Sequence, residues 1–141
     1  MIDLEKFKAY FNEHDRFSAK NGMRATEIRE GYARVELTVG EESKNFMGSM
    51  HGGLLYTMAD VAAGLAMVAY GKQVVTLNGS MEYIKAAYGG RVVAEGKVVA
   101  CGKTIARCEV KLCGEDGTLY GKSHLTMFIM DNEIPETFGD S

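Results

Sequence analysis

The sequence contains one proline and no tryptophan among its 141 residues, and it has no internal repeat or low-complexity segment. These absences exclude a collagen-like, repeat-built or wholly disordered chain. Hydrophobic residues make up 46% of the chain and charged residues 25%, which is the composition of an ordinary folded domain. The length suits one hydrophobic core, so we predict a single domain over residues 1–141.

Cysteine and histidine are also scarce. Cys101, Cys108 and Cys113 show no C-x-x-C spacing and lie in apolar segments, which is typical of reduced thiols rather than of a disulfide framework. The three histidines are far apart in the sequence, and no two of them have a spacing that favours zinc. We therefore predict no metal site, no bound cofactor and a cytoplasmic location.

Basic clusters and a leading apolar run are missing as well. The formal net charge is −3 and the lysines and arginines are scattered, whereas nucleic-acid recognition requires a basic face. The first residues, MIDLEKFKAYF, carry charges every few positions, where a signal peptide needs an uninterrupted apolar stretch. We expect no nucleic-acid partner, no export signal and no membrane anchor.

Hydrophobic periodicity predicts most of the secondary structure. Residues 1–22 comprise an amphipathic helix over 2–14, with Asp3 as candidate N-cap, and a connection to the first strands. Its aromatic side chains cover either a sheet edge or a ligand pocket. Alternating apolar residues predict a strand hairpin over 24–39, and residues 131–141 are predicted to form a loose tail. Four further strand-like runs, separated by glycine-containing turns, cover residues 74–86, 91–100, 104–112 and 119–130.

The segment 54–70 predicts a long core helix. Its only residues that are not apolar are Thr57, Asp60 and Gly64. A helix that is apolar on every side needs cover on every side, but one curved sheet covers only part of it. Since the chain has no spare helix, we expect a second copy of the subunit to supply the remaining cover through two-fold symmetry.

The window from Asn45 to Asp60 holds the residues best suited to chemistry. Asp60 is a carboxylate within an apolar helix, where an unpaired charge is costly, so it is either functional or it faces a wet groove or a hydrogen-bond partner. Gly52 and Gly53 lie where free N–H groups and the helix dipole converge, which suits a developing oxyanion but equally suits a tight turn. His51 could be a structural hydrogen-bonding residue, and Asn45 a turn residue.

The spacing of these residues predicts a shared site. Gly52 and Asp60 are separated by about 12 Å along one helix axis, at about 1.5 Å per residue. An oxyanion donor and an attacking group must both lie close to one reacting centre. If both residues act on one substrate, they must come from different helices, which again requires a two-fold dimer.

The combination of Asn45, His51-Gly52-Gly53 and Asp60 on a buried helix, followed by four long strands, resembles the hotdog-fold acyl-CoA thioesterases of the PaaI type. The resemblance covers residues 25–130. It implies an α+β fold in which a curved antiparallel sheet wraps around one long central helix. It also implies homodimers, often paired into tetramers, that hydrolyse an acyl-CoA substrate without a separate cofactor.

The resemblance also implies residue roles. The Gly52 N–H would polarise the thioester carbonyl, Asn45 and His51 would shape the oxyanion pocket, and Asp60 of the facing subunit would act as nucleophile or as base. Thr76, on the following strand, would hold the attacking water.

Coenzyme A contacts are expected at Gly53 and at the turn formed by Lys103 and Thr104. Arg91 and Lys85 are alternatives for the phosphate contact, and each of these residues could instead belong to a plain turn or a solvated surface. Related proteins of this fold act as hydratases, dehydratases or non-catalytic acyl-CoA-binding modules, and these alternatives stay open.

Overall fold

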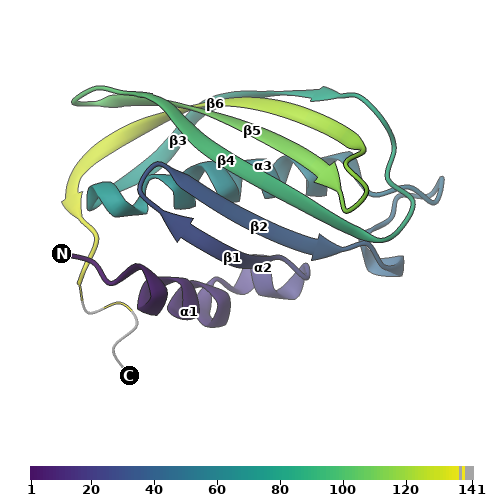
Figure 1. Ribbon diagram of the computed structural model, residues 1–141, viewed down its shortest axis with the longest axis horizontal. Coiled ribbons are helices and arrows are strands. Elements are labelled where there is room, and N and C mark those ends of the chain that lie inside the picture. Colours follow the sequence, from purple (N-terminus) through teal and green to yellow (C-terminus); the bar gives the residue numbers. More distant parts are fainter. Residues whose placement is uncertain (137, 139–141) are drawn as a thin grey trace.

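The computed structural model describes residues 1–136 and 138 and consists of one antiparallel sheet wrapped around a central helix (Figure 1). This confirms the predicted hotdog fold. The sheet has six strands in the order β1-β2-β4-β5-β6-β3, so β1 and β3 form its edges. The strands are β1 (Arg24–Arg29), β2 (Tyr32–Thr38), β3 (Lys72–Tyr83), β4 (Arg91–Cys101), β5 (Ile105–Gly114) and β6 (Leu119–Glu133).

The central helix, α3 (Gly52–Ala66), begins two residues earlier than predicted, because the His51 ring caps it and the glycines join its first turn. A 3-10 turn, η2 (Val68–Tyr70), follows it, and Gly71 ends the segment with a left-handed φ of 83°. A second short 3-10 turn, η1 (Glu41–Ser43), precedes the loop that leads to α3.

The core lies between α3 and the concave face of the sheet. In β5 the buried positions alternate with charged, outward-facing ones, as the sequence predicts. The helix approaches β4 so closely at Gly96 that a Cβ there would lie 2.9 Å from the Ala62 backbone, so only glycine fits. The buried residues of β5 are Ala106, Cys108, Val110 and Leu112.

One side of α3 is not covered by its own sheet. The segment Gly52–Tyr70 is long and apolar enough to cross a membrane, with a mean hydropathy of 1.4. A core helix has the same properties, and half of this segment is buried against the protein. The half-buried positions Thr57, Asp60, Val61 and Gly64 recur at helical spacing and form one open stripe.

The N-terminal helix, α1 (Leu4–His14), is capped by the Asp3 side chain as predicted. The structure adds a second helix, α2 (Arg16–Lys20), which we did not predict. This helix is too short to show an apolar period, and no side chain caps its first turn.

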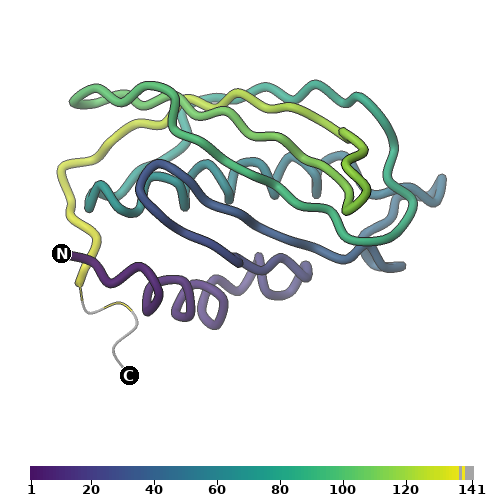
Figure 2. Tube along the Cα trace, viewed as in Figure 1, coloured from purple at the N-terminus to yellow at the C-terminus, as the bar shows by residue number. Residues whose placement is uncertain are grey.

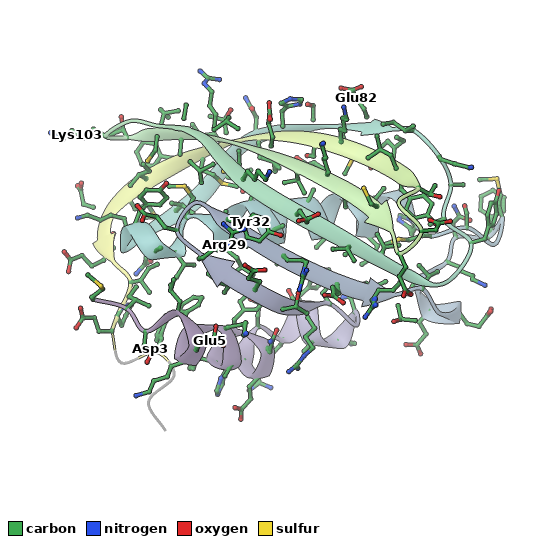
Figure 3. All side chains as sticks on the ribbon, in the orientation of Figure 1. Asp3, Glu5, Arg29, Tyr32, Glu82 and Lys103 are labelled. Carbon is green, nitrogen blue, oxygen red and sulfur yellow. The ribbon has the colours of Figure 1, made fainter. Side chains whose placement is uncertain are left out.

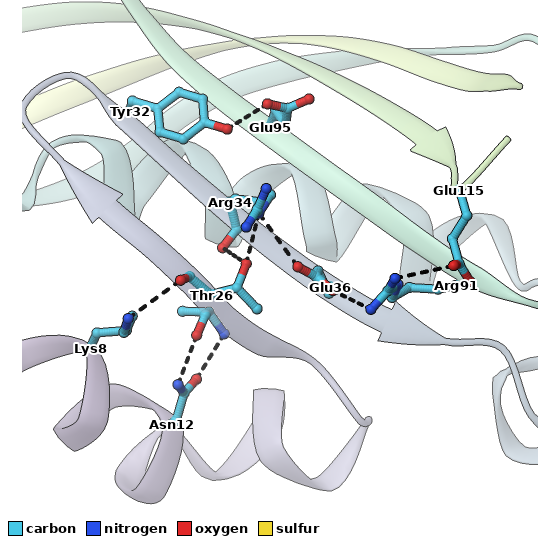
Figure 4. Close-up of polar contacts among 10 residues, drawn as sticks. Lys8, Asn12, Thr26, Tyr32, Arg34, Glu36, Arg91, Glu95 and Glu115 are labelled. Atoms are coloured by element: carbon cyan, nitrogen blue, oxygen red, sulfur yellow. Dashed lines mark hydrogen bonds and ion pairs between the residues drawn. The ribbon is translucent and has the colours of Figure 1, made fainter. Parts of the chain in front are cut away.

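The helix α1 covers the β1 edge of the sheet, and one of its side chains, Phe7, is buried in the core. The Asn12 side chain binds the backbone of Ala25 twice: Nδ2 donates to the carbonyl at 2.9 Å, and Oδ1 accepts from the N–H at 2.8 Å (Figure 4). The Lys8 ammonium donates to the Thr26 carbonyl at 3.3 Å. Phe7, on the inward face of α1, is buried.

The C-terminal segment differs from the predicted loose tail. Asp131–Glu133 continue β6, and the Ile134 N–H donates to the Gly71 carbonyl at 2.8 Å. The Phe138 ring stacks on Tyr10 of α1 at 4.8 Å between centroids. The segment that follows β6 therefore docks on α1 through Phe138, and Ile134 lies beside Gly71. The path of the chain from β6 towards α1 can be followed in Figure 2. Residues 137 and 139–141 lie outside the described residues.

The convex face of the sheet is charged and polar (Figure 3). The Tyr32 hydroxyl donates to the Glu95 carboxylate on the neighbouring strand, and the Arg29 guanidinium lies 3.9 Å above the Tyr32 ring. Burial, followed by this hydrogen bond and the Glu95 charge, raises the pKa of Tyr32 to about 12. The tyrosine is therefore held in its neutral form.

Candidate active site

Asp60 and Thr76 meet on the open side of α3. The Thr76 hydroxyl, on β3, donates to Oδ1 of Asp60 at 2.5 Å and also lies 3.5 Å from the Met127 sulfur. A β-bulge between Thr76 and Asn78 alters the register of β3 at this position. Among the described residues none bonds to Oδ2 of Asp60, so this oxygen is available to a ligand.

Asp60 is half-buried in the isolated subunit, not enclosed within the core as the apolar helix pattern implied. The reason is the gap in the sheet's cover: the carboxylate points out of the core along the open stripe. Of the alternatives considered for Asp60, the hydrogen-bond partner is present, and it is Thr76.

A pocket of about 410 Å³ adjoins this pair, and we call it the Asp60 pocket. It lies between α1, α3, β3 and the C-terminal segment, and its polar rim includes Asp15 and Lys72. The size is within the range of small-molecule sites. Its apolar lining consists of Phe7, Phe11, Val61, Leu65, Val68, Val74, Met127, Ile134 and Phe138.

Gly52 precedes the open stripe and lies in the first turn of α3. Among the described residues none accepts a hydrogen bond from its N–H, which is thus a free donor at the positive end of the helix. The Tyr83 hydroxyl donates to the Gly52 carbonyl at 2.9 Å, and a Cβ on Gly52 would lie 3.2 Å from the Tyr83 ring. This donor faces a second pocket of about 280 Å³, the Gly52 pocket, which Asn45 and Tyr83 also line.

His51 is the N-cap of α3. Its Nδ1 accepts a hydrogen bond from the Gly53 N–H at 3.0 Å, so the neutral ring carries its proton on Nε2. In this subunit His51 is therefore a structural hydrogen-bonding residue, which is one of the two roles that the sequence left open. The Gly53 N–H is occupied by this cap and is not free for a substrate.

Asn45 organises the loop before the helix. Its Oδ1 accepts from the Met47 N–H at 2.9 Å and from the Ser49 N–H at 3.2 Å, and its Nδ2 donates to the Ser49 hydroxyl at 3.1 Å. These bonds make Asn45 a turn residue. The same side chain lines the Gly52 pocket, so it shapes the wall beside the free donor.

The two ends of the candidate site do not meet within one subunit. The Asp60 pocket and the Gly52 pocket share no lining residue. Gly52 and Asp60 both belong to α3, and eight helical residues span about 12 Å. One carbonyl group cannot contact both residues of the same subunit.

The residues expected to contact coenzyme A lie at opposite ends of β4. Lys103 and Thr104 are exposed in the β4–β5 turn, and Lys103 projects from the tip of that hairpin (Figure 3). Arg91, at the start of β4, pairs with Glu36 at 3.2 Å and with Glu115 at 3.1 Å (Figure 4). The length of β4 separates them by about 30 Å, so they cannot bind one phosphate in the same subunit.

Sequence reasoning missed some residues of this site. No local pattern places the Tyr83 hydroxyl on the Gly52 carbonyl or Phe138 in the Asp60 pocket, because both contacts join distant parts of the chain. The described part of the chain holds no cluster of three or more His, Cys, Asp or Glu side chains that could bind a metal.

Comparison with known proteins identifies the class. The family described as the thioesterase superfamily matches residues 47–120. A protein of Archaeoglobus fulgidus named "Putative esterase" is 32% identical over 95% of this chain and 88% of its own length. The chain belongs to the thioesterase superfamily and is a hydrolase.

Solved structures agree with this assignment. The PaaI protein of E. coli, from the phenylacetic acid degradation operon, superposes with a TM-score of 0.86 over 93% of this chain and 98% of its own; at 21% identity it shows the fold alone. A hypothetical thioesterase of Streptococcus pneumoniae TIGR4, solved with coenzyme A, is 29% identical, covers 79% of this chain and 91% of its own, and has a TM-score of 0.75.

Two further structures under the Streptococcus pneumoniae name carry alanine in place of an aspartate and of a threonine, respectively. These two positions are 16 residues apart, the same separation as between Asp60 and Thr76.

Proposed function

We propose that this protein hydrolyses acyl-CoA thioesters to a carboxylic acid and free coenzyme A. The observation that carries the proposal is the Asp60–Thr76 pair, which opens onto a mostly apolar pocket. A carboxylate with one free oxygen provides the attacking group, and the pocket provides apolar surface for an acyl group. The coenzyme A bound to the pneumococcal relative supports this substrate class.

The proposed chemistry needs a carboxylate and one oxyanion donor. A thioester is electrophilic, so Oδ2 of Asp60 either attacks the carbonyl carbon or removes a proton from an attacking water. Direct attack breaks the C–S bond and forms a mixed anhydride with Asp60, which a water molecule then cleaves to release the carboxylic acid and restore the carboxylate. In the water route the hydroxyl of the activated water adds to the acyl carbon and the C–S bond breaks. In both routes one water is consumed in total: its hydroxyl ends on the acyl carbon and a proton ends on the coenzyme A thiolate. Thr76 holds Oδ1 and so orients the carboxylate in either route.

The oxyanion donor comes from a partner subunit in this proposal. Gly52 has a free N–H, but it lies too far from Asp60 of its own chain. Two copies of α3 related by a two-fold axis and running in opposite directions bring Gly52 of each chain towards Asp60 of the other. Two identical sites result.

The β3 edge is the proposed pairing surface. It is the sheet edge that α1 leaves uncovered, and Val75 and Leu77 on it are 49% and 55% exposed. An apolar open edge favours pairing with another strand. A β3–β3 pairing also covers the open Thr76 and places the two copies of α3 side by side.

For the nucleotide end of coenzyme A, the contacts favour Lys103 over Arg91. The Arg91 guanidinium is engaged by two carboxylates, and an anion there would meet Glu36 and Glu115. Lys103 is exposed and forms no ion pair within the part of the chain that the structure describes. We therefore propose Lys103 as the phosphate contact.

Hydratase or dehydratase activity and non-catalytic binding are the alternatives. Among the described residues no histidine lines the Asp60 pocket, whereas a carboxylate does, and this favours hydrolysis. Release of free thiol from an acyl-CoA distinguishes hydrolysis from both alternatives, since neither of them cleaves the C–S bond.

The test is thiol release from short, medium and aromatic acyl-CoAs by the natural protein and by Asp60→Asn. We expect Asp60→Asn to lower kcat by at least about a hundredfold, because the amide is neither a nucleophile nor a base. The exposed Asp131→Asn is the matched control and should keep full activity. A natural protein that releases no thiol, or an equally active Asp60→Asn, would contradict the proposal.

A further inference from the structure

Gly64 occupies a position in α3 where glycine has no structural reason within the subunit. It lies one turn after Asp60, inside a helix, and its φ is not in the left-handed region. Glycine is the poorest helix former except for proline. An ideal Cβ on Gly64 would meet no heavy atom within 4 Å beyond its own helix backbone.

Other glycines around α3 contrast with Gly64. A Cβ on Gly96 would lie 2.9 Å from the Ala62 backbone, and one on Gly79 would collide with the Tyr56 hydroxyl. Those glycines permit close packing. Gly64 instead leaves a space empty, and this space belongs to the Asp60 pocket.

The position of Gly64 within the pocket indicates what the space is for. Residues four apart lie on one helix face, so Asp60 and Gly64 are neighbours on one side of α3. Both line the pocket, and so does Val68 at the start of the η2 turn that follows α3. Phe7 and Phe11 of α1 close the far side. An acyl group whose carbonyl lies at Asp60 and whose chain extends into the apolar part of the pocket must pass over Gly64.

We propose that Gly64 determines the size of the acyl group: the missing side chain opens the apolar end of the Asp60 pocket to medium-length or ring-containing acyl chains. This proposal rests on the proposed function, because it assigns the acyl part of the thioester to that pocket. It assigns Gly64 a role in specificity and none in the chemical step.

The experiment compares the natural protein with Gly64→Ala and Gly64→Leu on a series of straight-chain acyl-CoAs from acetyl to octanoyl and on an aromatic acyl-CoA. We expect Gly64→Leu to lower kcat/KM for octanoyl-CoA and the aromatic substrate at least about tenfold relative to acetyl-CoA. The ratio of kcat/KM for octanoyl-CoA to that for acetyl-CoA should be intermediate in Gly64→Ala, between the ratios of the natural protein and of Gly64→Leu. Gly40→Leu adds the same side chain at an exposed glycine with open space around it, and should leave the profile unchanged.

A binding measurement separates this proposal from the proposed function. In the Asp60→Asn background, calorimetry should show that Gly64→Leu weakens octanoyl-CoA binding at least about tenfold and leaves acetyl-CoA binding within about threefold. If the natural protein releases no thiol but this difference in binding persists, the hydrolytic function fails and the role of Gly64 holds.

Three results would overturn the role of Gly64. One is an unchanged ratio between octanoyl-CoA and acetyl-CoA in both the kinetic and the binding experiment. Another is an equal loss for all acyl groups in a folded Gly64→Leu protein. The third is dissociation of the Gly64→Leu protein into smaller species by light scattering, which would show that the glycine is kept for contact with a second subunit.

Discussion

The Thr76 hydroxyl donates its proton to Oδ1 of Asp60 across 2.5 Å, from a strand 16 residues further along the chain. This bond fixes one carboxylate oxygen and leaves the other free. The carboxylate is therefore oriented before any substrate binds.

Replacing Thr76 should show whether it orients the Asp60 carboxylate or contributes to substrate binding. We expect Thr76→Val, which keeps the shape and removes the hydroxyl, to lower kcat about tenfold to a hundredfold with little change in KM. Thr76→Ser keeps the hydroxyl and should retain most of the activity. Steady-state thiol release measures both, and equal kinetics for Thr76→Val and the natural protein would remove Thr76 from the mechanism.

A mixture of two inactive variants should test whether the site is shared. Asp60→Asn removes the attacking group, and Gly52→Pro removes the N–H donor at the first helical position, where proline is tolerated. In a heterodimer one site receives both defects and the other receives neither. We therefore expect purified heterodimers, carrying a different tag on each chain, to show about half of the natural activity.

Two controls belong to that experiment. Gly52→Ala adds a Cβ beside Tyr83 but keeps the N–H, so it separates the steric effect from loss of the donor. Light scattering of the active species should give the mass of at least a dimer. Folded heterodimers without activity would mean that Gly52 and Asp60 do not act on the same substrate across an interface.

The three cysteines should differ in reactivity. Cys108 is buried, its thiol lies 3.9 Å from the Ala63 carbonyl, and burial, with a smaller contribution from Cys101, raises its pKa to about 11. Because the thiolate is the reactive form, a thiol reagent at pH 8 should modify the exposed Cys101 rapidly and Cys108 only after unfolding. Mass spectrometry of the labelled peptides checks the order, and Cys101→Ser should remove the fast phase.

Stability should fall at alkaline pH through Tyr32. Its pKa is raised from 10.0 to about 12, so the fold favours the neutral phenol. This stabilisation, of the order of 2 kcal/mol, is complete below pH 10 and is lost as the pH rises through 12. Tyr32→Phe should flatten the decline of Tm between these values, whereas Tyr88→Phe, at an exposed tyrosine, should not. If Tm declined equally with pH in the natural protein, Tyr32→Phe and Tyr88→Phe, the raised pKa of Tyr32 would not contribute to stability.

Much of the fold could be predicted because its signals are local. The alternation in β5 and the apolar run of α3 each report burial within one element. The short helix α2 has no such signal, and the docking of Phe138 on Tyr10 joins residues that are far apart in the sequence. Such contacts are set by the tertiary structure, and periodicity does not contain them.

The sequence indicated which residues belong to the candidate site better than it indicated their burial and their contacts. A carboxylate in an apolar helix identified Asp60, but its half-buried state follows from the side of α3 that the sheet leaves open. Thr76 was assigned only by resemblance, since nothing local joins it to Asp60. The His51 contact with Gly53 is local, and it matches the structural alternative for that histidine.

The double hydrogen bond from Asn12 to Ala25 has a consequence for growth of the sheet. A sheet with two open edges can add strands at both ends and extend into a fibre. Here the α1 side chains already occupy backbone groups of the β1 edge, which leaves β3 as the edge at which another chain can add. The proposed pairing of two β3 edges would leave an occupied edge at each end, so the combined sheet would not add further strands.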